Sequence, residues 1–97
     1  MGDLSVPWEF EYSGQFRRDL KLMQRRHLPL DELNDVLKVL LARQPLDAKY
    51  RDHDLSSAWT GFRECHIQPD WLLIYKADNA THLISLARTG SHSDLFG

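Results

Sequence analysis

The sequence contains a single cysteine, Cys65, so no disulfide can form within the chain. A lone thiol fits a protein that stays in a reducing cytoplasm. The sequence also lacks an apolar run of about 18 residues, the length that a membrane-spanning helix needs. Its first residues lack the basic and apolar regions of a secretory signal. We therefore expect a cytoplasmic protein with no membrane partner.

A strong charge of either sign is missing as well, because the formal net charge is −2. Global charge therefore does not indicate a nucleic-acid-binding protein. No G-x-S-x-G motif supports a serine nucleophile, and no glycine-rich loop supports a nucleotide-phosphate site. The length of 97 residues and the hydrophobic content of 42% predict one domain over residues 1–97.

Hydrophobic periodicity predicts one strand, two helices and then three strands. Residues 1–7 are expected to be an irregular start, and alternating aromatic residues predict a strand over 8–12. Helical spacing predicts helices over 13–28 and 31–43, capped by Ser13 and Asp31. Turn signals separate three further strands, predicted over 62–67, 71–76 and 82–88, and residues 91–97 are expected to add one helical turn. The predicted fold is therefore α+β, with a mostly antiparallel four-stranded sheet and two N-terminal helices packed on one face.

Several residues with useful chemistry lie in loops or at strand ends, where functional side chains often gather. They are His53, His66, Asp70, Arg88 and His92. RNA cleavage without a metal needs a base for the 2′-hydroxyl, an acid for the departing 5′-oxygen and a cation for the phosphorane. If these ends converge on one rim of the sheet, imidazoles, a carboxylate and an arginine supply all three. In addition, Trp71 or Phe96 could stack on an exposed base.

Each candidate also has a simpler explanation. The histidines could be surface or capping residues, Asp70 could serve only the turn, and Arg88 could pair with a carboxylate such as Glu64. Metal binding is a rival function, because histidine and aspartate are acceptable ligands for zinc or another first-row ion. The metal candidates are His53, His66, His92 and Asp70. Their spacing in the sequence is not that of a tight ligand motif.

A ten-residue stretch of the first predicted helix carries a cluster of five basic residues: Arg17, Arg18, Lys21, Arg25 and Arg26. Such a cluster can hold phosphates even when the net charge is slightly negative. It could equally be a solvated helix face. By contrast, Cys65 has no clearly thiolate-stabilising neighbours and is expected to be an inert strand residue.

Seven segments of the sequence resemble the YafQ branch of the RelE-type toxins, which belong to bacterial toxin–antitoxin systems. These segments are residues 11–16, 19–22, 26–27, 52–55, 59–63, 66–75 and 88–97. The most specific parts are His66-Ile67-Gln68-Pro69-Asp70-Trp71 and Arg88-Thr89-Gly90-Ser91-His92. The resemblance implies a microbial RNase fold with a twisted, mostly antiparallel sheet. It also implies an mRNA endonuclease that acts in the ribosomal A site, needs no metal or other cofactor, and uses the 2′-hydroxyl of the RNA as nucleophile.

The resemblance places the functional positions of this family on His53, His66, Asp70, Trp71, Arg88, His92 and Phe96. It implies that His92 is the general acid, that Asp70 or His66 is the base, and that Arg88 stabilises the phosphorane. His53 would position or protonate the phosphate, Trp71 would support the site, and Phe96 would position the substrate.

The resemblance also implies partners. The basic helix, with Arg17, Arg18, Lys21 and Arg25, would face ribosomal RNA. A cognate antitoxin of the DinJ type would inhibit the toxin, and operator DNA would be bound only through the toxin–antitoxin complex. An alternative is a non-catalytic module of the same fold that inhibits translation or acts as a co-repressor with an antitoxin.

Overall fold

The alternation of apolar and charged residues near the N-terminus forms strand β1 (Glu9–Tyr12). This strand belongs to a five-stranded sheet in the computed structural model of the chain, which describes residues 6–97. The strand order is β1-β5-β4-β3-β2, with β2 at His53–Asp54, β3 at Arg63–Gln68, β4 at Trp71–Asp78 and β5 at Leu83–Gly90. Most of the irregular start predicted for residues 1–7 lies outside the described residues.

The prediction of four strands was wrong by one, because β2 arises within the stretch 46–57 that the sequence indicates to be a loop. A strand of two residues is too short to show an alternating pattern. The same stretch also contains the 3-10 helix η1 (Ala48–Tyr50), and a second one, η2 (Ser57–Trp59), begins at its last residue. The predicted hairpins are confirmed, since β3 pairs antiparallel with β4, and β4 with β5. β1 pairs in parallel with β5, so the sheet is mixed.

Two helices follow β1: α1 (Gly14–Arg25) and α2 (Leu30–Leu41). Ser13 caps α1 as predicted, because its Oγ accepts a hydrogen bond from the Phe16 backbone N–H at 2.9 Å. α1 ends earlier than predicted, since His27 has a left-handed backbone with φ 59°. The predicted cap of the second helix by Asp31 is wrong, because α2 begins at Leu30 with Pro29 at its N-cap position and without a side-chain cap, so that Asp31 lies in the first turn. α2 ends before Arg43, whose φ is 57°.

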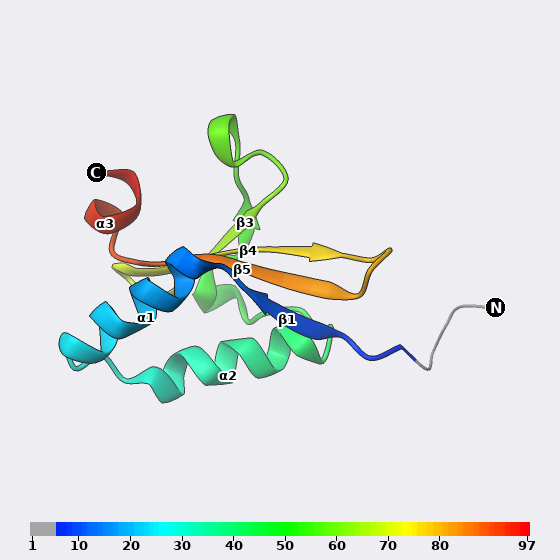
Figure 1. Cartoon of the computed structure of the whole chain (residues 1–97), viewed down its shortest axis with the longest axis horizontal. Coiled ribbons are helices and arrows are strands. Elements are labelled where there is room, and N and C mark those ends of the chain that lie inside the picture. Colours follow the sequence, from blue (N-terminus) through cyan, green and yellow to red (C-terminus); the bar gives the residue numbers. More distant parts are fainter. Residues whose placement is uncertain (1–5) are drawn as a thin grey trace.

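The two helices lie on the same side of the sheet, as predicted (Figure 1). α1 packs mainly against β5, and α2 against β3. The short helix α3 (His92–Phe96) forms the C-terminal turn that the sequence predicts, and it lies beyond the end of β5. Within residues 6–97, no helix combines the length and apolar character needed to cross a membrane.

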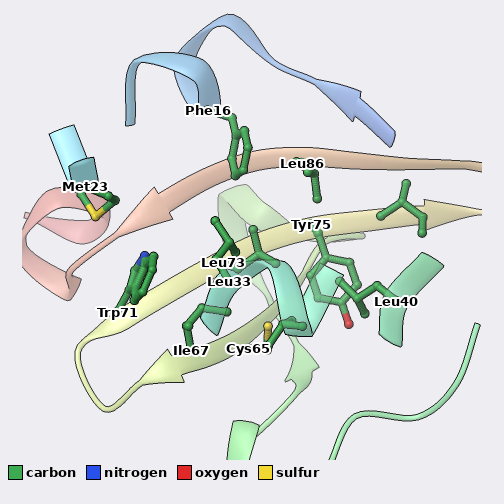
Figure 2. Packing of buried hydrophobic residues seen from close by; sticks show 12 residues of the cluster. Phe16, Met23, Leu33, Leu40, Cys65, Ile67, Trp71, Leu73, Tyr75 and Leu86 are labelled. Carbon is green, nitrogen blue, oxygen red and sulfur yellow. The ribbon is translucent and has the colours of Figure 1, made fainter. Parts of the chain in front are cut away.

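The hydrophobic core fills the space between the helices and the sheet (Figure 2). Phe16 and Met23 of α1 and Leu33 of α2 are almost fully buried against the central strands. On β3, Cys65 and Ile67 point into this core. Because side chains alternate across a strand, Glu64 and His66 lie on the opposite face. The same alternation that builds the core therefore presents polar side chains on the face away from α2.

Cys65 is expected to resist thiol reagents in the folded protein. Its side chain is completely buried, and burial raises the pKa of its thiol above the ordinary value, with smaller contributions from the charges of Asp52 and Glu64. The thiolate is the reactive form, so alkylation should be slow. Iodoacetamide labelling followed by mass spectrometry should show slow modification in buffer and fast modification in denaturant. Labelling of the folded protein as fast as that of free glutathione would contradict this burial.

Candidate active site

Three imidazoles form a row on the face of the sheet that points away from the core. The ring centroids of His53 and His66 are 6.3 Å apart, and those of His66 and His92 are 5.7 Å apart. The three residues come from β2, β3 and the start of α3, so strand order brings together segments that are distant in the sequence. This is the convergence on which the chemical hypothesis depends.

His92 is held by Asp70, which lies at the bend between β3 and β4. Asp70 Oδ1 accepts hydrogen bonds from the His92 backbone N–H at 2.9 Å and from His92 Nδ1 at 2.6 Å. These two hydrogen bonds place the pKa of the Asp70 carboxyl below its ordinary value. Because a carboxylate only accepts, Nδ1 carries a hydrogen and Nε2 is the ring nitrogen left to face a substrate.

The helix that carries His92 is anchored at its first turn. Ser91 and Asp94 form a capping box, in which each side chain accepts a hydrogen bond from the backbone N–H of the other. Arg26, just after α1, makes a two-pronged ion pair with Asp94 at 2.6 and 3.0 Å. This guanidinium is the main reason that the pKa of Asp94 lies well below its ordinary value. The C-terminal end of α1, through Arg26, therefore helps to position α3.

The segment that carries His53 is anchored by a second set of charges. Arg63 Nη2 donates to Asp52 Oδ2 at 2.9 Å, and the Tyr75 hydroxyl donates to Asp52 Oδ1 at 2.5 Å. Burial and the neighbouring Asp52 raise the pKa of Tyr75. His53 Nδ1 lies 2.6 Å from the carbonyl oxygen of Arg51, which fixes the ring.

Glu64 is a site residue that sequence reasoning missed. It lies on β3 beneath two of the imidazoles, and its Oε1 is 3.2 Å from His66 Nε2 and 3.7 Å from His53 Nε2. Only 5% of Glu64 is exposed. The available signal was its position two residues before His66, which places both side chains on one face of the strand.

Glu64, His66 and His92 also present ligand atoms within 4.8 Å of one another, close enough to share a metal ion. Imidazole and carboxylate are ligands that zinc and other first-row ions accept. This set replaces the Asp70 and His53 of the predicted metal group with Glu64. Asp70 is instead engaged with His92.

Arg88 pairs with Asp19 of α1 and not with Glu64, the carboxylate that the sequence suggested. Arg88 Nε donates to Asp19 Oδ2 at 2.8 Å, and Nη2 donates to Oδ1 at 3.2 Å. The hydrogen bond to Asp19 is the main reason that the pKa of Arg88 is raised. In the sheet, Arg88 is paired with Ile74 of β4. Two residues further along β5, Gly90 is paired with Leu72, and Leu72 is paired on its other side with His66 of β3.

The two aromatic candidates have different surroundings. Stacking of Trp71 on a substrate base is wrong as a prediction, because only 1% of this residue is exposed and its ring lies in the core (Figure 2). Its indole N–H donates to Thr89 Oγ1 at 2.9 Å, which suits a supporting role. Phe96 of α3 is 50% exposed and is free to contact a substrate.

The basic residues of α1 do not join the row of imidazoles, but all four of the predicted contacts are exposed: Arg17, Arg18, Lys21 and Arg25. They lie on the outer side of a helix whose inner side carries Phe16 and Asp19.

A separate hollow of about 460 Å³ adjoins His66 and is bordered by charges of both signs, including Glu32, Lys49 and Arg51. The exposed helix face and this hollow, which His66 borders, are thus two distinct surfaces.

Comparison with known proteins gives consistent matches over nearly the whole chain. The sequence profile of the family described as "Bacterial toxin of type II toxin-antitoxin system, YafQ" matches residues 8–97. The chain is 46% identical over 90 residues to the mRNA interferase toxin YafQ of Escherichia coli (strain B / BL21-DE3), with 92% of this chain and 96% of the relative covered.

Solved structures agree with the sequence matches. YafQ in the crystal structure of the E. coli DinJ–YafQ complex superposes with a TM-score of 0.85 at 45% identity, covering 93% of this chain and 99% of that one. A metal-bound toxin from Helicobacter pylori superposes with a TM-score of 0.86 at 40% identity, covering 92% and 99%. The likeness therefore extends over the elements that carry the imidazoles, Asp70 and Arg88.

Proposed function

This chain belongs to the YafQ family of bacterial toxins of type II toxin–antitoxin systems, and on that basis we propose that it is an mRNA interferase. It is an endoribonuclease that cuts mRNA in the ribosomal A site and thereby inhibits translation in the cytoplasm. The observation that carries the proposal is the convergence of His66 and His92, with Asp70 fixing the His92 ring. Two imidazoles at this separation can act on opposite sides of one phosphodiester.

In the proposed reaction, the 2′-hydroxyl of the RNA attacks the adjacent phosphorus, and the bond to the 5′-oxygen breaks. His92 donates the proton from Nε2 to the departing oxygen, because Asp70 holds the other ring nitrogen. The products are a 2′,3′-cyclic phosphate and a 5′-hydroxyl.

His66 is the proposed base. The sequence left Asp70 and His66 as equal candidates, but Asp70 already accepts two hydrogen bonds from His92 and its pKa is lowered. A carboxylate with a lowered pKa is a weak proton acceptor near neutrality, whereas an imidazole suits that pH. Because Glu64 Oε1 lies 3.2 Å from His66 Nε2, that nitrogen would carry a hydrogen and Nδ1 would accept the proton of the 2′-hydroxyl. Glu64 would then stabilise the imidazolium that forms.

The remaining residues bind and orient the substrate. Arg88 would place positive charge where the phosphorane develops negative charge, and His53 would position or protonate the phosphate. Phe96 offers an exposed ring on which a base can stack. Trp71 supports the site from within the core through Thr89.

The basic face of α1 is proposed to contact ribosomal RNA through Arg17, Arg18, Lys21 and Arg25. A near-neutral chain has few phosphate contacts of its own, so the ribosome would supply most of the orientation of the mRNA. A DinJ-like antitoxin is the proposed inhibitor, since the E. coli relative is found in a DinJ–YafQ complex. Operator DNA would be bound only by the toxin–antitoxin complex.

Cleavage should be much stronger on ribosomes than on naked RNA and should persist in a chelator. Primer extension on a defined mRNA would compare purified ribosomes with naked RNA, each with and without EDTA after back-addition of the Mg²⁺ that ribosomes need. We expect strong cuts on ribosomes, weak cuts on naked RNA and no loss after first-row ions are removed. Loss that Zn²⁺ restores would favour a metal-dependent hydrolase. Inhibited translation without any cut would favour the non-catalytic binding module.

A further inference from the structure

Asp19 is a charged residue buried on the inner side of the basic helix α1. Only 5% of it is exposed, and its carboxylate accepts four hydrogen bonds. Oδ2 accepts from Arg88 Nε at 2.8 Å and from the Thr89 backbone N–H at 3.1 Å. Oδ1 accepts from Arg88 Nη2 at 3.2 Å and from Gln15 Nε2 at 3.0 Å. A buried carboxylate with this many donors has a fixed position.

The position of Asp19 follows from the end of β1. The parallel pairing of β1 with β5 runs from Glu9↔Leu83 to Tyr12↔Leu86, so β1 does not reach Thr89. α1 passes along β5 beyond this point, and Asp19 supplies the acceptor that the Thr89 N–H would otherwise lack. Satisfying a buried backbone donor is itself a reason for a carboxylate here.

The contact with Arg88 goes beyond that backbone need. A guanidinium has five N–H donors in one rigid plane. Asp19 takes the edge formed by Nε and Nη2, and among residues 6–97 Nη1 has no hydrogen-bond partner. Fixing one edge orients the whole plane, so Nη1 is presented with little freedom to turn.

A hydrogen-bonded chain connects this pair to the bend that carries Asp70. Thr89 Oγ1 donates to the Leu72 carbonyl oxygen at 2.7 Å and accepts from Trp71 Nε1 at 2.9 Å. Trp71 directly follows Asp70, which holds His92. The positions of Arg88 and His92 are therefore both fixed by hydrogen bonds to the same part of β4 and β5.

We propose that Asp19 is a positioning residue for catalysis: it holds the Arg88 guanidinium by one edge so that Nη1 faces the scissile phosphate. This inference rests on the proposed function, in which Arg88 stabilises the phosphorane. Preorganised donors stabilise a transition state because they need not reorient as charge develops. Asp19 itself does not touch the substrate.

The test is Asp19→Asn combined with Arg88→Ala in a double-mutant cycle. The asparagine oxygen can still accept from Arg88 Nε and Thr89, but its NH₂ group then meets the Nη2 donor. We expect Asp19→Asn to lower kcat for cleavage on ribosomes by about 10- to 100-fold with little change in KM. In the Arg88→Ala background the same substitution should have no further effect, because the group on which it acts is gone. Asp31→Asn, an exposed charge change on α2, is the matched control and should keep wild-type kcat.

Equal loss in both backgrounds would overturn the proposal, since it would show that Asp19 supports only the fold. An unchanged kcat for Asp19→Asn in the chain that keeps Arg88 would overturn it too. If circular dichroism shows that Asp19→Asn does not fold, Asp19→Glu replaces it in the same cycle, with the same expected dependence on Arg88. Failure of the proposed function is distinguishable, because then the wild type would not cut mRNA at all, or Arg88→Ala alone would leave kcat unchanged.

Discussion

Asparagine in place of His92 is expected to slow mRNA cleavage on ribosomes by about 10²- to 10⁴-fold, the usual contribution of a general acid or base. The side-chain amide can still donate to Asp70 Oδ1, as His92 Nδ1 does at 2.6 Å. It cannot release a proton near neutral pH, so only the chemical role is removed. Single-turnover primer extension at saturating ribosomes would measure the rate, and KM should change little.

The control for this substitution is His27→Asn, which changes an exposed histidine outside the row of imidazoles. Asparagine tolerates the left-handed backbone at that position, where φ is 59°. It should cut as fast as the wild type. Both variants should bind the antitoxin, which separates loss of chemistry from loss of fold. Wild-type cleavage by His92→Asn would exclude His92 as the acid.

Removal of the Arg88 side chain is expected to lower kcat by about 10²- to 10³-fold, as loss of one preorganised transition-state donor commonly does. The cation is held within 3.2 Å of Asp19 by two nitrogens, so its guanidinium is oriented before the substrate arrives. Arg88→Lys should recover only a small part of the rate. A lysine carries the charge but lacks the second edge that would face the phosphate while the first stays on Asp19.

Lys38→Ala is the matched control for Arg88, because it removes an exposed cation from α2 that lies away from the imidazoles. It should leave kcat unchanged. Arg88→Ala also leaves Asp19 buried without its main partner, so the variant should unfold at a lower temperature. Cleavage must therefore be measured well below that temperature. A rate for Arg88→Lys equal to that of the wild type would show that charge alone is sufficient.

Local patterns in the sequence predicted the elements well where they are long and regular. The apolar run Trp71–Tyr75, with the turn at Pro69-Asp70 before it and a strand-like stretch before that, predicted the central hairpin, and the structure confirms it. The same patterns missed β2, which has two residues and no periodicity. They also extended α1 past the point where His27 adopts a left-handed backbone, because a histidine at helical spacing does not signal such a change.

The identities of the site residues were also accessible from the sequence, through their chemistry and through the resemblance to the YafQ branch. Their partners were not. Glu64 was considered only as a partner of Arg88, whereas it lies beneath His66 and His53. Trp71 was a candidate for base stacking, whereas its ring is buried against the core. Whether an aromatic ring faces the core or the solvent depends on which face of the strand the helices cover.

The sequence by itself determined the α+β class, the central hairpin, the Ser13 cap and the set of reactive side chains, because these depend on neighbours within a few residues along the chain. Only the tertiary structure decided that His53, His66 and His92 meet, that Asp70 holds His92, and that Asp19 holds Arg88 across 69 positions of sequence. Such contacts follow from strand order, register and the parallel pairing of β1 with β5. Those features are set by the packing of the whole chain, and no local pattern encodes them.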